Sequence, residues 1–147
     1  MKAVNIQNKR ARFEYNILDK YVAGLQLGGT EIKSIRKSKV NVSDSFCSFK
    51  DNELYIIGMH IDEYEFGNYA NHPPKRERKL LLNRHELDKI RKKILDVGLT
   101  IVPLRLFIND KGWAKIEIAV AKGKKLHDKR KTIKDRDIQR DIDRAIK

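Results

Sequence analysis

Residues 100–121 read TIVPLRLFINDKGWAKIEIAVA. Two apolar segments in this stretch, Thr100–Ile108 and Ala114–Ala121, are rich in β-branched and other apolar residues, which predicts two strands. Between them, Asn109–Gly112 supplies Asn, Asp and Gly, the residue types that tolerate the left-handed backbone of a hairpin turn. The stretch therefore predicts an antiparallel hairpin.

Four more segments have a strand-like composition: Lys9–Tyr15, Val22–Leu27, Val40–Phe49 and Leu54–Ile61. Asp51 and Asn52 separate the last two and predict a second hairpin turn. Six short strands fit a closed sheet better than a parallel α/β sheet, because closure removes the exposed edges that invite aggregation. The predicted fold class is therefore mainly β: a small closed antiparallel OB-like barrel of about six strands with two or three short helices.

One helix has clear boundary signals. Asn83 can cap its start, and Glu86 stands three residues later, as in a capping box. Its predicted buried stripe consists of Leu87, Ile90, Ile94 and Val97. Gly98 is the predicted residue that ends the helix. A shorter helix is predicted from Thr30 to Lys37, with Ile32 and Ile35 inward, and a short turn from Ile17 to Tyr21.

The end of the chain has a different composition from the rest. Residues 1–122 carry the strand and helix patterns of the barrel, whereas residues 123–147 begin with GKKLHDKRK, which is too polar to bury. Further on, Ile138, Ile142 and Ile146 recur every four residues, which gives a thin apolar stripe on a latent helix. An isolated helix of this length is marginal in water. We therefore expect a basic tail that is disordered in the free protein and ordered by a partner.

The charge points to a polyanionic partner. The net charge is +13 and the sequence pI is about 9.9. Basic residues concentrate in residues 1–50, 74–95 and 122–147, whereas residues 51–73 contain acidic residues and no Lys or Arg. This balance favours nucleic acid as the partner, with an anionic membrane surface as the second choice.

Residue types that carry catalysis are poorly represented. Cys47 is the single cysteine, so neither an intrachain disulfide nor a cysteine-based zinc site can form. The four histidines show no metal-ligand spacing, and there is no Gly-rich phosphate loop. We expect no enzyme activity, no metal and no cofactor. No apolar run approaches the ~18 residues of a membrane helix, and we expect a cytoplasmic protein without a membrane partner.

Basic runs are the stronger candidates for a site. Lys9, Arg10 and Arg12 stand at the start of the first predicted strand. A second run, predicted to lie in a loop after Pro74, contains Lys75, Arg76, Arg78 and Lys79. Arg makes forked contacts to phosphate oxygens and Lys supplies a mobile charge. Such runs are often only solvated surface, but three basic regions in one small chain favour RNA or DNA binding.

Five ordered motifs make the pattern specific. They are Asn8–Ala11 followed by Tyr15, Gly29–Arg36, Pro74–Leu82, Gly98–Leu104 and Gly123–Arg130. In order and spacing they resemble the SmpB family, whose members bind transfer-messenger RNA (tmRNA, or SsrA RNA). The resemblance implies an OB-like barrel that binds the tRNA-like domain of tmRNA. It also implies delivery of alanyl-tmRNA, with elongation factor and GTP, to stalled ribosomes for trans-translation. The alternative is a ribosomal or general single-strand RNA-binding OB protein.

The resemblance also suggests which residues contact RNA. For tmRNA these are Asn8, Lys9, Arg10, Glu31, Lys33, Arg36, Arg78, Lys79, Lys124 and Lys125. Two readings of Glu31 stay open: it accepts a hydrogen bond from RNA, or it stabilises the first turn of a short helix. Leu80, Leu81 and Leu82 suit the core or a loop anchor, and an RNA-facing role for one of them stays open.

The resemblance assigns the tail to the ribosome. It implies that the tail becomes helical in the empty mRNA channel, next to the small-subunit decoding site. The residues expected there are His127, Asp128, Lys129, Arg130, Arg136, Arg140 and Arg144.

Overall fold

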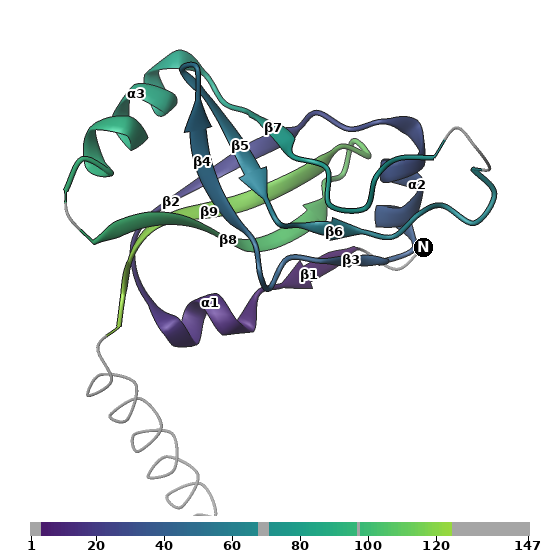
Figure 1. Ribbon diagram of the computed structural model, residues 1–147, viewed down its shortest axis with the longest axis horizontal. Helices are drawn as coiled ribbons and strands as arrows, with labels where there is room; N and C mark the ends of the chain where they lie inside the picture. Colours follow the sequence, from purple (N-terminus) through teal and green to yellow (C-terminus); the bar gives the residue numbers. More distant parts are fainter. Residues whose placement is uncertain (1–3, 68–70, 97, 125–147) are drawn as a thin grey trace, which may run out of the picture.

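The computed structural model describes residues 4–67, 71–96 and 98–124. These residues form three helices and nine strands (Figure 1). The helices are α1 (Lys9–Glu14), α2 (Gly29–Arg36) and α3 (Arg84–Lys93). The strands are β1 (Asn5–Gln7), β2 (Tyr15–Leu25), β3 (Val40–Asn41), β4 (Phe46–Lys50), β5 (Glu53–Ile57), β6 (His60–Ile61), β7 (Arg78–Leu81), β8 (Leu99–Ile108) and β9 (Ala114–Gly123).

Six of the strands close into a ring. The sheet order is β1-β8-β4-β5-β7-β2-β9, and an additional pairing of β8 with β9 joins the two ends of the six-strand run. Every pairing is antiparallel. Strand β1 is not part of the ring and pairs with β8, and β3 and β6 form a separate two-stranded sheet. The predicted closed antiparallel sheet is confirmed.

The core fills the inside of this ring. It is built from inward-facing aliphatic side chains such as Ala23, Leu54, Ile56, Leu106 and Ile116. Each fully buried Leu or Ile side chain contributes about 1.5–3 kcal/mol through loss of apolar surface from water. Figure 1 shows α3 at one end of the ring and α2 at the other.

Both helices at the ends of the ring begin close to where the sequence predicts. In α3, the side chain of Asn83 accepts a hydrogen bond from the amide of Glu86 (2.8 Å), and the Glu86 carboxylate accepts one from the amide of Asn83 (3.4 Å). In α2, Ile35 is buried and Ile32 is partly buried against the core. The prediction that Gly98 ends α3 is wrong, because the C-cap is Ile94 and Gly98 lies four residues later with φ +87°.

The predicted strand Lys9–Tyr15 is wrong. It is the helix α1, and β2 starts only at Tyr15. Asn8 explains the difference, because its side chain accepts from the amide of Ala11 (3.2 Å) and caps the helix. The predicted turn at Ile17–Tyr21 is also wrong: these residues lie within β2, where only a register shift between Ile17 and Asp19 marks an irregularity.

Two predicted strands are broken into pairs. In the segment Val40–Phe49, the Asn41 side chain accepts from the amide of Ser43 (2.8 Å), which closes a turn between β3 and β4. In the segment Leu54–Ile61, Gly58 has φ +85° and separates β5 from β6. The predicted hairpin turns are confirmed: Asp51 and Asn52 adopt φ +49° and +70° between β4 and β5.

The turn between β8 and β9 has the predicted chemistry. Gly112 adopts φ +84°, and the Asn109 side chain accepts from the amides of Lys111 (3.1 Å) and Trp113 (2.9 Å). At the other end of the hairpin, β9 runs to Gly123. The predicted tail, apart from its first two residues, lies outside the described residues.

Candidate nucleic-acid interface

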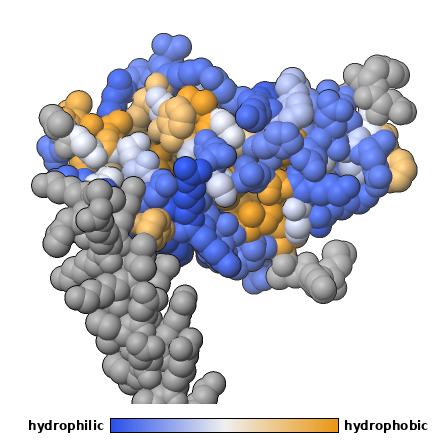
Figure 2. Space-filling model, turned by 60° about the horizontal axis from the view of Figure 1, so that its bottom comes forward, coloured by the Kyte–Doolittle hydropathy of each residue, from blue (hydrophilic) through white to orange (hydrophobic). Residues whose placement is uncertain are grey.

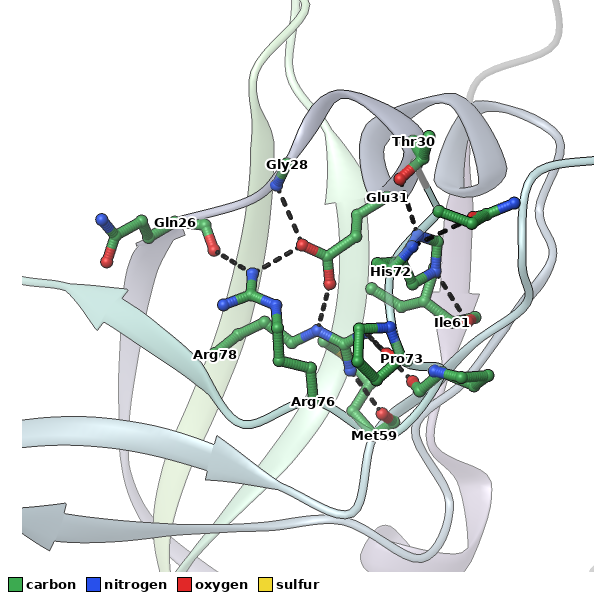
Figure 3. A network of polar contacts seen from close by, with 12 residues as sticks. Gln26, Gly28, Thr30, Glu31, Met59, Ile61, His72, Pro73, Arg76 and Arg78 are labelled. Atoms are coloured by element: carbon green, nitrogen blue, oxygen red, sulfur yellow. Dashed lines mark hydrogen bonds and ion pairs between the residues drawn. The ribbon is translucent and has the colours of Figure 1, made fainter. Parts of the chain in front are cut away.

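A buried carboxylate organises the end of the ring that carries α2. Glu31 lies in the first turn of α2, and its Oε1 accepts from the amide of Gly28 (2.9 Å) and from Nη2 of Arg76 (2.5 Å). Its Oε2 accepts from Nε of Arg78 (2.5 Å) (Figure 3). Arg78 also donates through Nη1 to the carbonyl of Met59 (2.6 Å). One carboxylate thereby ties α2 to β7 and to the segment before it.

The contacts of this network change the pKa of Glu31 and of Arg78. Burial alone would raise the pKa of Glu31, but hydrogen bonds from Arg76, Gly28 and Arg78 outweigh it, so the pKa of Glu31 lies below its ordinary value. Burial lowers the pKa of Arg78, and the hydrogen bond and charge of Glu31 oppose that change. At neutral pH both groups therefore stay charged and paired.

His72, in the segment between β6 and β7, also contacts α2. Its Nε2 lies 3.0 Å from the carbonyl oxygen of Ile61, and its Nδ1 lies 2.8 Å from the hydroxyl of Thr30. A carbonyl can only accept, so Nε2 donates to the carbonyl oxygen of Ile61, and Nδ1 and the Thr30 hydroxyl share the second hydrogen bond. The ring bridges β6 and α2, and Figure 3 shows it beside the Glu31 network.

An open groove of about 730 Å³ runs over this network. Its lining includes Gly28, Gly29, Thr30, Lys33 and Arg76. The two glycines add no side chains to the start of α2, so the backbone is accessible there. Lys33 also lies over the ring of Tyr64, with its Nζ 5.3 Å from the ring centre.

Three of the predicted RNA contacts are internal. Glu31 and Arg78 are buried in the pair described above, and Asn8 is buried beside β8. The Asn8 side chain donates to the carbonyls of Pro103 (2.8 Å) and Val42 (3.3 Å). The predicted loop position of Arg78 is wrong, because Arg78 lies in β7. Its guanidinium donates to acceptors of the protein itself. Of the two readings of Glu31, the geometry matches a stabilising role in the first turn of α2.

The other predicted contacts fall into two groups. Lys33 and Arg36 are exposed on α2, and Lys79 on β7 is half-buried with Nζ 3.8 Å from Glu53. Lys9 and Arg10 are exposed on α1, where Arg10 pairs with Glu14 and Asp44. The amide of Lys124 donates to the carbonyl of Glu14 (2.8 Å), which attaches the end of β9 to α1. Lys125 and the predicted ribosome contacts from His127 onward lie outside the described residues.

An exposed apolar surface was missed by the sequence analysis. Val22 on β2 and Leu81 on β7 are half exposed, although their neighbours Ala23 and Leu80 are fully buried. Gly24 pairs with both Leu81 and Lys115 in the sheet, so Leu81 and Lys115 flank a position without a side chain. We call Val22, Gly24, Leu81 and Lys115 the sheet face. The apolar residues that end β2 and β7 follow one another without alternation in the sequence, so the sequence did not indicate which of them face outward.

Exposed apolar residues also occur outside the sheet face, among them Phe66, Leu95 and Trp113. Figure 2 shows one face as mostly hydrophilic, with hydrophobic side chains gathered in separate patches. Among residues 4–67, 71–96 and 98–124, no group of His, Cys, Asp and Glu has the arrangement of a metal site. In the same residues, no helix is long and apolar enough to cross a membrane. Burial raises the pKa of the Cys47 thiol far above its ordinary value, so this cysteine is a poor nucleophile.

Comparison with known proteins identifies relatives over the whole chain. A family model described as SmpB protein matches residues 5–147. An SsrA-binding protein of Flavobacterium psychrophilum is 60% identical over 147 residues, which cover 100% of this chain and 98% of the relative. An SsrA-binding protein of Bacteroides thetaiotaomicron is 54% identical over 145 residues, which cover 99% of this chain and 97% of the relative.

A solved structure has the same fold. It is described as "tmRNA-SmpB: a journey to the center of the bacterial ribosome", and its matching chain is 48% identical with a TM-score of 0.71. The match covers 84% of this chain and 87% of the solved one. The predicted resemblance is confirmed, since the family model and the relatives extend over nearly all residues. The chain belongs to the SmpB protein family.

Proposed function

We propose that this chain binds tmRNA and acts with it on the bacterial ribosome in trans-translation. The observation that carries the proposal is the match to a solved SmpB chain described with tmRNA and the ribosome, at 48% identity over 84% of this chain. The net charge of +13 supports it, because a basic protein of this size is attracted to RNA phosphates. The proposed role is binding and requires no catalytic step of the chain.

Two kinds of accessible side chain, cationic and apolar, would contact the RNA in this proposal. Folded RNA is recognised by its shape, its 2′-hydroxyls and its unstacked bases more than by groove reading. Lys33, Arg36 and Lys115 can reach phosphates from α2 and β9, whereas Val22 and Leu81 offer apolar surface for sugars and bases. We assign the contact with the tRNA-like domain of tmRNA to these residues and their neighbours.

The buried groups have a positioning role in this proposal. The pair of Glu31 and Arg78 fixes α2 against β7, and Asn8 fixes α1 against β8. Loss of either would alter the surface that carries the exposed cations without removing a contact to RNA. This assignment changes the role that the resemblance suggested for Asn8, Glu31 and Arg78, from contact to support.

The finer steps extend the same proposal. The folded part would bind alanyl-tmRNA, which elongation factor and GTP deliver to a stalled ribosome in the cytoplasm. The tail, with Lys129 and Arg130 near its start, would enter the decoding site and the empty mRNA channel. Ordering a tail costs ~1–2 kcal/mol per residue in backbone entropy. Only a channel that offers many contacts at once can offset this cost, and a channel filled with mRNA excludes the tail.

Direct binding tests the proposal. Fluorescence anisotropy with a labelled transcript of the tRNA-like domain should give saturable binding, and unlabelled tmRNA should compete much better than an equal mass of ribosomal RNA fragments. Equal competition by both RNAs would favour a general RNA-binding protein and contradict the proposal.

A further inference from the structure

Trp113 is exposed at a hydrogen-bonded turn. It is the only tryptophan of the chain, and 67% of its surface is accessible. The Asn109 side chain accepts from its amide (2.9 Å), and its carbonyl accepts from the amide of Asn109 (2.9 Å). These two hydrogen bonds fix the backbone of Trp113 at the turn, and its indole ring presents a large amphipathic surface to solvent.

A small groove lies beside the ring. It has a volume of about 250 Å³, and apolar side chains of β2, the segment after it and α2 line it: Leu25, Leu27 and Ile32. Trp113 lines it from the turn between β8 and β9, which lies next to α2 in Figure 1. Leu27 also lines the larger groove over the Glu31 network, so the two grooves share a border.

Arg36 lies at this groove and has an unused guanidinium. It is the last residue of α2 and is exposed. Every other arginine in the described part of the chain has an ion pair or hydrogen bond to another residue, whereas no protein acceptor binds the guanidinium of Arg36. A positive group without a partner, next to an exposed indole ring, fits a ligand that combines a flat ring with a negative charge.

We propose that this groove, which we call the Trp113 groove, holds one unstacked RNA nucleotide. The base would stack on the indole ring and cover Leu27 and Ile32, while Arg36 would bind the phosphate. Stacking suits any base, because every base has a π-face, and the arginine fork fits phosphate oxygens. The proposal rests on the proposed function, because it assumes that the partner is RNA, and it adds a specific contact residue on the turn between β8 and β9.

The single tryptophan makes the groove directly observable. Titration of the full chain with a transcript of the tRNA-like domain should quench the fluorescence of Trp113, with the same midpoint as the anisotropy of the labelled transcript. Trp113→Ala should lower the affinity about tenfold, and Trp113→Phe should lower it less because a stacking ring remains. Arg36→Gln should weaken binding and make it less dependent on salt.

Phe66 supplies a matched control. It is an equally exposed aromatic residue (68%) that does not line the groove. Phe66→Ala should bind the transcript like the parent, and circular dichroism should show unchanged folding for all variants. If the anisotropy of the labelled transcript rises while the fluorescence of Trp113 stays unchanged, and Trp113→Ala binds like the parent, the Trp113 groove is overturned and the proposed function stands. No anisotropy change with the parent would overturn both.

Discussion

Glu31 and Arg78 form an ion pair in which both side chains are almost completely inaccessible, with 1% and 0% of their surfaces exposed and 2.5 Å between Oε2 and Nε. The two residues stand 47 positions apart, so the pair joins α2 to β7. Such a pair is costly to bury, and its geometry and additional hydrogen bonds must offset that cost. Here Gly28, Arg76 and backbone carbonyls supply these hydrogen bonds.

The first prediction concerns stability. Glu31→Gln leaves the guanidinium of Arg78 charged and buried without a counter-ion. The free energy of unfolding in urea should therefore fall by about 3–5 kcal/mol. Glu65→Gln is the matched control, because Glu65 forms an exposed pair with Lys37. The control should change stability little, since water screens exposed pairs. An equally small effect of both substitutions would show that the Glu31 pair does not hold α2.

The second prediction concerns pH. The pKa of Glu31 in the folded chain lies below its ordinary value of 4.5, so between the two values the unfolded chain binds more protons. The contribution of Glu31 to stability is therefore complete above about pH 4.5 and is lost as the pH falls through the folded pKa. The difference in unfolding free energy between the parent and Glu31→Gln should shrink from pH 7 to pH 3. A constant difference over this range would contradict the assigned pKa direction.

Local sequence signals predicted the parts of the fold that local physics determines. The capping box at Asn83 and Glu86, the turn at Asp51 and Asn52, and the hairpin around Gly112 each depend on neighbouring residues alone. The same reasoning failed at Lys9–Tyr15, where the composition predicted a strand and the structure has the helix α1. The cap by Asn8, which is fixed in turn by the carbonyls of β8, determines the helix there.

The site was less predictable, because exposure depends on partners that are distant in sequence. Its basic run suggested that Arg78 contacts phosphate. In the structure Arg78 is buried and pairs with the carboxylate of Glu31, 47 positions away. The three leucines Leu80–Leu82 suited the core or a loop anchor, with an RNA-facing role open for one of them. The structure buries Leu80 in the core and leaves Leu81, the next residue of β7, half exposed. Which of two neighbouring strand residues, such as Leu80 and Leu81, faces outward is determined by how the strands pair in the closed ring.

The third prediction concerns the sheet face. Leu81→Ser should weaken tmRNA binding by about 1–2 kcal/mol through loss of apolar contact, with no change in salt dependence. Lys115→Ala should reduce the log–log salt slope by about 0.7–0.9, as expected for one lost phosphate contact. Leu95→Ser is the control, since Leu95 is a largely exposed leucine beyond the end of α3. Equal losses for Leu81→Ser and Leu95→Ser would show that the sheet face is not the contact surface.

The fourth prediction separates the folded part from the tail. A chain that stops after Lys131 should bind tmRNA with nearly parent affinity, because the ring is complete by Gly123. The same truncation should abolish tagging of proteins on stalled ribosomes in a reconstituted translation assay. Lys129→Ala with Arg130→Ala should reduce tagging in the full-length chain and leave tmRNA affinity unchanged. Normal tagging by the truncated chain would show that the tail is only solvated surface.

The central claim is that tmRNA is the RNA partner of this chain. The most direct measurement is affinity capture of the full-length protein from a bacterial lysate, followed by sequencing of the bound RNA. The account predicts that tmRNA dominates the recovered RNA relative to its abundance in the lysate, and that Lys33→Ala combined with Lys115→Ala reduces this enrichment. Recovery of messenger and ribosomal RNA in proportion to their abundance, without enrichment of tmRNA, would contradict it.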